Sequence, residues 1–169
     1  QFADTELGQV DAALGAAGLH DDTLLVVFSD HGYEFDDYGT GYVGHASSFS
    51  DAQLRSVLVM RCPGRPPARL AHRTSHLDVL ATLLGDWLGC TNPPGDYSTG
   101  RSLFAGTDWP WLVAGSYGAH AIVEPGRRTV TQPGGFVEVR GADYRPLAGA
   151  ALDPAVVEAA LAAMQRFYQ

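Results

Sequence analysis

An aspartate and a histidine stand side by side at Asp30 and His31, directly before Gly32. A carboxylate oxygen beside an imidazole nitrogen suits Zn²⁺ or Mn²⁺ and does not exclude Ca²⁺ or Mg²⁺. The glycine at position 32 predicts a sharp backbone turn that lets both side chains face one ion. A second histidine, His45, follows Gly44 later in the chain. This spacing predicts a divalent metal site at Asp30 and His31, to which a long loop returns His45.

The apolar run over residues 23–28 favours this functional interpretation. The run does not alternate with polar residues, which is typical of a strand buried on both faces in a sheet covered by helices. Ligands bind at the carboxyl ends of such strands, because the loops diverge there, and Asp30 stands at that end. The alternative is structural. An Asp-His-Gly triplet also occurs by chance, in which case Asp30 caps a helix and His31 packs.

Other polar and aromatic residues have simpler interpretations. Three acidic residues of the loop after Gly32 are candidates for further ligands, but acidic loops are usually just solvated: Glu34, Asp36 and Asp37. The remaining histidines fall in a surface turn, around a helix start or in an edge-strand pattern: His20, His72, His76 and His120. The tryptophans are interpreted as core and packing residues and not as a ligand platform: Trp87, Trp109 and Trp111.

The composition excludes several classes of protein. Of 169 residues, 46% are hydrophobic and 18% charged, which indicates a packed domain. The net charge is −8, all 11 basic residues are arginine, and an acidic surface of this kind is not expected to bind nucleic acid. Cys62 and Cys90 lack the spacing of a zinc finger, and both a disulfide and two free thiols fit the sequence.

The elements that would position the site follow an α/β pattern. Helical periodicity covers residues 4–17 and 75–88, with Gly18 and Gly89 as stop signals and a capping box at Ser75 and Asp78. A second short strand is expected over 57–60. The loop from Gly32 to Leu54 is too long for a simple connection and predicts a functional loop or a small helix.

The last third of the sequence changes character. Alternating segments separated by Gly and Pro turns predict an antiparallel meander over 111–116, 119–124, 127–132 and 135–140. Asp153 and Pro154 then begin a helix expected over 154–168. We therefore expect an α/β core over 1–108 and a meander subdomain with a terminal helix over 109–169.

Several motifs carry a family resemblance over nearly the whole chain. The segment from Asp4 to Gly32, which ends in Ser-Asp-His-Gly, resembles the sulfatase-like branch of the alkaline phosphatase superfamily. The motif Tyr-Val-Gly-His-Ala-Ser-Ser-Phe-Ser over 42–50, "HLDVLATLL" and "DYSTGRSLF" narrow it to the YejM (PbgA) type of inner-membrane protein. The resemblance implies the C-terminal part of an alkaline-phosphatase-like mixed sheet flanked by helices, plus a small antiparallel sheet.

The resemblance also implies roles for the site residues. In active relatives the residues matching Asp30 and His31 bind the metal, and the residue matching His45 contacts the substrate anion or a second metal. The nucleophile and the other acidic ligands belong to an N-terminal half, and the start at Gln1 indicates a piece of a longer protein. Two departures are present: Tyr33 stands where many membrane-anchored relatives have glutamate, and the chain lacks the lysine that sulfatases commonly use near the Gly-His motif.

The function implied is that of a metal-dependent hydrolase or transferase acting on phosphate or sulfate esters of envelope lipids. The missing lysine favours phosphate. The alternative is a catalytically silent, lipid-binding regulatory domain that controls outer-membrane lipid composition, so activity of the parent protein stays open. The expected location is the periplasmic face of the inner membrane, with any membrane anchor outside this chain. The expected partners of this chain are the missing N-terminal half and a lipid or small anionic ester. The chain alone is expected to be inactive.

Overall fold

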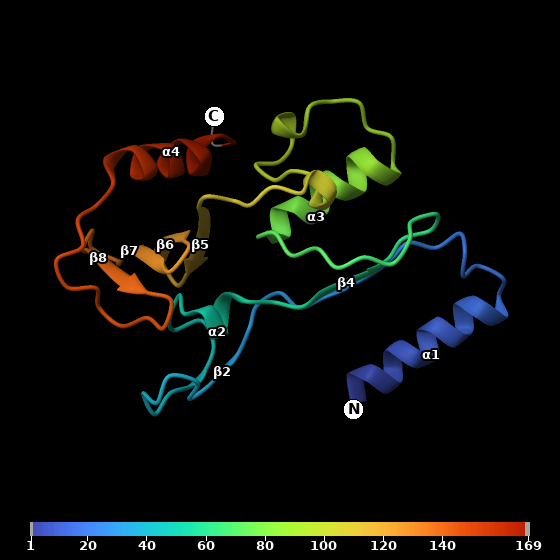
Figure 1. The fold of residues 1–169 in the computed structure, drawn as a ribbon, viewed down its shortest axis with the longest axis horizontal. Helices are drawn as coiled ribbons and strands as arrows, with labels where there is room; N and C mark the ends of the chain where they lie inside the picture. The colour runs from blue at the N-terminus through green and yellow to red at the C-terminus, as the bar shows by residue number, and fades with distance from the viewer. Residues whose placement is uncertain (1, 168–169) are drawn as a thin grey trace. The chain divides into compact units, whose positions relative to one another are not determined.

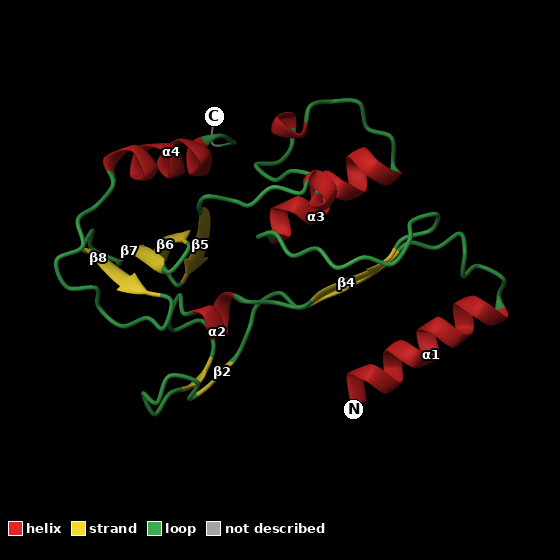
Figure 2. Ribbon diagram, viewed as in Figure 1, coloured by secondary structure: helices red, strands yellow, loops and turns green. Residues whose placement is uncertain are grey.

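The structure is a computed structural model that describes residues 2–167. The chain forms two compact units, Gln1–Ser29 with Ser56–Arg69 and Asp30–Arg55 with Leu70–Gln169. Figure 1 shows their elements in chain order, and Figure 2 shows how long loops alternate with short strands and helices. The predicted domain boundary between residues 108 and 109 stays a prediction, although the change from helices to antiparallel strands does occur near it.

The first unit consists of helix α1 (Phe2–Ala16) and two paired strands, β1 (Leu25–Phe28) and β4 (Leu58–Arg61). Helix α1 ends before Gly18, whose φ of 69° is the left-handed conformation that the sequence predicts for this cap. The side chain of Asp11 joins α1 to β4 through an ion pair with Arg61, and its Oδ1 lies 2.9 Å from Nε2 of His20. His20 is therefore a structural residue, as expected.

The prediction that residues 23–28 form a strand buried on both faces is wrong for this chain. Strand β1 pairs antiparallel with β4 and with no other described strand. Its side chains are half-buried, and Phe28 is 51% exposed. An apolar run indicates that a strand can be buried, but the layers that cover it come from other segments. Among the described strands, β4 is the one that pairs with β1.

The second unit contains a four-stranded antiparallel sheet that confirms the predicted meander. Its strands pair in sequence order: β5 (Leu112–Ser116), β6 (Ala119–Glu124), β7 (Arg127–Thr131) and β8 (Val137–Gly141). His120 lies on β6, an inner strand and not the expected edge. Helix α4 (Pro154–Gln165) packs against β5, with Ala160 fully buried. Asp153 Oδ1 caps it by accepting the Ala155 N–H at 3.0 Å, and the predicted residue 168 lies outside the described part.

Helix α3 (His76–Thr82) continues into a π-helical turn, η1 (Leu83–Trp87), so the predicted helix over 75–88 is present with a wider last turn. Ser75 and Asp78 form the predicted capping box. Leu77, Leu80 and Leu88 are exposed, whereas Asp78, Ala81 and Thr82 form a buried face. That face packs against η3 (Leu103–Ala105), and Thr82 Oγ1 accepts the Leu103 N–H there at 2.8 Å.

Replacing Asp78 should destabilise the second unit. Its carboxylate is 1% exposed and accepts the N–H of Ser75 at 2.8 Å, that of Arg101 at 2.9 Å and the indole N–H of Trp109 at 2.9 Å. Asp78→Ala leaves these donors without acceptors, so we expect a loss of about 3 kcal/mol in unfolding free energy, measured by urea denaturation. The exposed Asp21→Ala should change it by less than about 0.5 kcal/mol. An Asp78→Ala midpoint equal to that of the control contradicts this account.

Candidate metal centre

The segment between the two candidate histidines folds into a small hairpin and a short helix. Strand β2 (Glu34–Phe35) pairs antiparallel with β3 (Val43–Gly44), and helix α2 (Asp51–Leu54) follows. The predicted small helix in this long loop is thereby confirmed. The hairpin brings the segment before β2 and the residue after β3 to the same end, which places His31 near His45.

A backbone carbonyl favours one tautomer of the His31 ring. Its Nδ1 lies 2.7 Å from the carbonyl oxygen of Gly32. A carbonyl only accepts, so Nδ1 carries a proton, and in the neutral form of the ring Nε2 has the lone pair. His31 Nε2 lies 3.7 Å from Oδ1 of Asp30, which also accepts the His31 backbone N–H at 3.0 Å. The Asp30 side chain is 87% exposed, so this carboxylate oxygen and imidazole nitrogen lie near each other at the surface.

His45 stacks on His31. The two ring centroids are 4.4 Å apart with an angle of 15° between the planes. The ring of Tyr33 lies on His45 at 5.6 Å and on Phe35 at 4.7 Å. The structure thus brings all three predicted site residues together, and their chemical roles stay predictions.

The Asp30 and His31 atoms fit a divalent ion as part of a larger ligand set. Two ligands about 2.1 Å from a tetrahedral zinc ion lie about 3.4 Å apart, close to the 3.7 Å between Oδ1 and Nε2. The backbone carbonyl on Nδ1 is a frequent partner of a metal-binding histidine. Two donors are too few for a complete site, and among residues 2–167 no group of three or more His, Cys, Asp or Glu side chains is placed to hold an ion.

Buried polar contacts tie the two histidine segments to each other. Glu34 is 4% exposed, and its Oε2 accepts the Ser50 hydroxyl at 2.9 Å and the Gln53 amide at 2.8 Å. The Gln53 carbonyl accepts the Gly32 N–H at 2.9 Å, and Gln53 Oε1 accepts the Ser47 N–H at 3.1 Å. Glu34 is therefore neither an ion ligand in this geometry nor solvated, contrary to its interpretation from the sequence. Gln53 therefore connects the segment of His31, through Gly32, to the segment after His45, through Ser47.

The loop after His45 is anchored in the four-stranded sheet. Phe49 is 3% exposed and belongs to the core of that sheet, with Ala121, Val123 and Val130. Its carbonyl accepts the Nε–H of Arg128 at 3.0 Å, and the same guanidinium forms an ion pair with Asp51. One residue past His45, the Ala46 carbonyl accepts the Ser116 hydroxyl at 2.7 Å. Strands β5 and β7 therefore hold the segment that carries His45.

Sequence reasoning missed these supporting residues. Ser50 followed by Gln53 has the spacing of a capping box, which predicts the start of α2 but not the bond to Glu34. Phe49 and Ser50 both stand in the motif over 42–50, so the family resemblance could have indicated them. Nothing in the sequence points to Arg128 or Ser116. The other acidic candidates, Asp36 and Asp37, are exposed and accept N–H groups of their own hairpin: those of Gly41 and Phe35, both at 2.7 Å.

Gly32 is required here for a different reason than the one predicted. It does not have a positive φ, so the turn itself would accept other residues. A Cβ at this position would lie 2.2 Å from the carbonyl oxygen of Ala52 and 2.5 Å from that of Arg55. The absence of a side chain allows the segment with Asp30 and His31 to pass directly against α2.

Comparison with known proteins identifies the family. The family model described as Sulfatase matches residues 1–89, more than half of the 169 residues. The chain belongs to the sulfatase family. It is 28% identical over 123 residues to the inner membrane protein YejM of Salmonella typhimurium, covering 72% of this chain and 20% of that protein. An uncharacterized protein of Haemophilus influenzae is 23% identical over 105 residues, 62% of this chain and 18% of that protein. The chain thus spans about a fifth of these relatives.

Two solved structures share the fold of this sulfatase-family chain. The phosphonate monoester hydrolase of Silicibacter pomeroyi superposes with a TM-score of 0.65 at 22% identity, over 98% of this chain and 38% of that one. The phosphonate monoester hydrolase of Agrobacterium radiobacter gives 0.66 at 20% identity, with the same coverage. The predicted alkaline-phosphatase-like α/β fold and the predicted similarity to YejM are confirmed.

Adding one methyl group at position 32 should disturb the site. Gly32→Ala places a Cβ against two backbone carbonyls that cannot rotate away, so the segment from Asp30 to His31 must move off α2. We expect a loss of more than about 2 kcal/mol in unfolding free energy, measured by urea denaturation.

The control is Gly8→Ala in the middle of α1, where a Cβ meets nothing within 4 Å. It should stabilise the chain by about 0.5–1 kcal/mol, because alanine has the higher helix propensity. Equal effects at the two positions would refute the packing constraint at Gly32.

Proposed function

We propose that this chain supplies part of the active site of a metal-dependent sulfatase-family hydrolase or transferase that acts on phosphate or sulfate esters. The arrangement of Asp30, His31 and His45 carries the proposal. An imidazole nitrogen and a carboxylate oxygen lie 3.7 Å apart, and a second imidazole stacks on the first. Asp30 and His31 would hold a divalent ion, and Zn²⁺, Mn²⁺, Ca²⁺ and Mg²⁺ all remain candidates.

Each side chain has a defined task in this proposal. A bound divalent ion would offset negative charge on the transferring group and favour the ionised form of a hydroxyl nucleophile. Asp30 brings a negative charge that attracts the cation, and the Gly32 carbonyl keeps the proton of His31 on Nδ1, so that Nε2 stays free to bind. His45 would donate a hydrogen bond to an oxygen of the ester anion. Its stacking on His31 limits the orientations of its ring.

The remaining parts of the active site would come from outside this chain. The chain covers 38% of one solved relative. The proposed nucleophile and further acidic ligands would lie in an N-terminal half of the parent protein. The exposed apolar side chains of β1 and β4, among them Phe28 and Val59, would be covered by that half. That half and the ester are the partners we propose, and no nucleic acid is expected on a chain of net charge −8.

The ester is proposed to be a phosphate ester of an envelope lipid, at the periplasmic face of the inner membrane. The similarity to YejM, an inner membrane protein, supports this location. No helix within residues 2–167 is long and apolar enough to cross a membrane, and any anchor would belong to another part of the parent. The absence of lysine supports phosphate over sulfate, because the chain lacks the sulfate-binding lysine expected near the Gly-His motif.

The proposal makes a testable statement about the 169-residue chain by itself. Two ligands give weak metal binding, and a missing nucleophile gives no turnover. Calorimetric titration with Zn²⁺ should show a dissociation constant above about 10 μM, which Asp30→Ala weakens and the exposed Asp21→Ala does not. Assays with a chromogenic phosphodiester and a sulfate ester should show no hydrolysis. Tight stoichiometric binding, or turnover abolished by Asp30→Ala, would show that the chain completes a site alone.

A longer chain that includes the N-terminal half separates enzyme from regulator. For an enzyme, kcat/KM on the phosphodiester should fall about 100- to 1,000-fold in His31→Ala and His45→Ala, as when a catalytic electrostatic contact is removed. His72→Ala, outside the site, should leave it unchanged. Only His31→Ala should lower the bound metal content. A well-folded longer chain that binds metal stoichiometrically and hydrolyses neither ester would favour the silent, lipid-binding alternative.

A further inference from the structure

A cleft of about 390 Å³ lies in the second unit, between the end of α4, strand β5 and the segment 95–100. This volume falls in the range of small-molecule sites, which is about 300–1,000 Å³. Its walls are mostly large apolar or aromatic side chains, with one cation: Leu77, Trp109, Trp111, Leu112, Met164 and Arg166. None of the residues of the candidate metal centre takes part in it.

The walls of the cleft are fixed before any ligand binds. The indole N–H of Trp109 is bonded to buried Asp78 at 2.9 Å, and the guanidinium carbon of Arg101 lies 4.0 Å from the centre of its ring. The Ser98 hydroxyl donates to the Leu77 carbonyl at 3.2 Å and accepts the Gly100 N–H at 2.9 Å. Because these polar groups already have partners, the surface left to a ligand is largely apolar.

The charge of the cleft is opposite to that of the chain. The sequence has 19 acidic residues and 11 basic ones, yet no acidic residue lines the cleft and Arg166 is its one charged group among the described residues. The guanidinium of Arg166 packs against Gly95, where a Cβ would lie 2.5 Å from Nη2. The glycine therefore leaves room for the cation at the edge of an apolar cleft.

We propose that this cleft binds a single-chain amphiphile with an anionic head group. The alkyl chain lies against Trp111, Leu112 and Met164, where it leaves water, and the head group pairs with Arg166. This assignment goes against the sequence interpretation, which preferred packing to a ligand platform for Trp109 and Trp111, because both side chains line the cleft. The proposal does not depend on the chemistry proposed for Asp30, His31 and His45.

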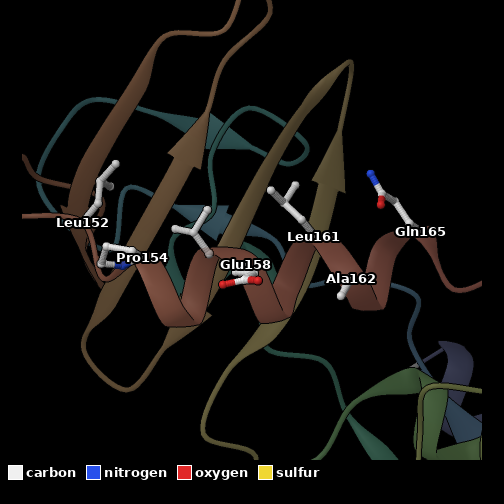
Figure 3. A pocket seen from close by; sticks show the side chains of 7 residues that line it. Leu152, Pro154, Glu158, Leu161, Ala162 and Gln165 are labelled. Atoms are coloured by element: carbon white, nitrogen blue, oxygen red, sulfur yellow. The ribbon is translucent and has the colours of Figure 1, made fainter.

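A second hollow provides an internal comparison. It runs along α4 and is lined by Leu152, Pro154 and Leu161, with Glu158 as its one charged group (Figure 3). An anionic amphiphile is repelled by this carboxylate and attracted by Arg166. Substitutions in the two places therefore distinguish the cleft from apolar surface in general.

The test uses three probes of equal chain length with the 169-residue chain, below their micelle concentrations and at low salt. These are decanoate, decanol and decyltrimethylammonium, followed by tryptophan fluorescence and calorimetry. Decanoate should bind with one-to-one stoichiometry and about two- to fivefold more tightly than decanol, the range for one exposed ion pair. The cation should bind most weakly. Equal affinity for all three, preference for the cation, or no saturable binding overturns the proposal.

Variants locate the binding site. Ala163→Leu fills the cleft from α4 and should reduce decanoate affinity more than tenfold, while circular dichroism shows an intact fold. Arg166→Gln should remove the preference for decanoate over decanol without affecting decanol, whereas the exposed Arg69→Gln should change neither. Leu161→Ser, in the hollow on α4, should leave decanoate binding unchanged. Loss of binding in Leu161→Ser with retention in Ala163→Leu would place the amphiphile elsewhere and overturn the assignment.

Discussion

The buried guanidinium of Arg128 is the contact on which the position of His45 depends. It is 2% exposed on β7, donates to the Phe49 carbonyl at 3.0 Å and pairs with Asp51. Burial lowers the pKa of Arg128, and the negative charge of Asp51 opposes that shift, so the pair keeps the cation charged inside the protein. Removing one partner of such a pair costs about 3–5 kcal/mol, because the other charge stays buried alone. The loop after His45 therefore cannot leave the sheet without a large penalty.

The residues that would bind an ion or a substrate differ from the residues that hold them in place. The groups that would meet an ion or a substrate are exposed, as with the Asp30 side chain at 87%. The groups that hold them are buried, as with Gln53 at 3% and Glu34 at 4%. The sulfatase family model matches residues 1–89, yet Arg128 lies on a strand beyond that match. The sheet after residue 111 thus contributes to the site by holding one of its loops, without supplying a ligand.

Patterns within a few neighbouring residues were sufficient to predict most helices and strands of the fold. The meander and α4 were predicted from alternation, Gly and Pro turns and the Asp153 cap, all of which act within a few residues. The environment of β1 was not predicted correctly, because the segments that pair with a strand and cover it lie far away in sequence. Asp30 and His31 were predicted from their types and their position after an apolar run, and His45 from the family resemblance and the long loop. Arg128 and Phe49 are 79 residues apart in sequence, and no local pattern in either segment predicts their contact. Only the folded chain brings the two residues together.

The most direct test of this account is nuclear Overhauser spectroscopy of the histidine ring protons. Ring centroids 4.4 Å apart predict cross-peaks between His31 and His45 in the native chain. In Arg128→Met, which removes the charge and keeps an apolar side chain, these cross-peaks should disappear while the amide signals of β5 and β6 keep their native pattern. Cross-peaks of undiminished intensity in the folded variant would show that the stacking does not depend on the sheet, and would contradict the account.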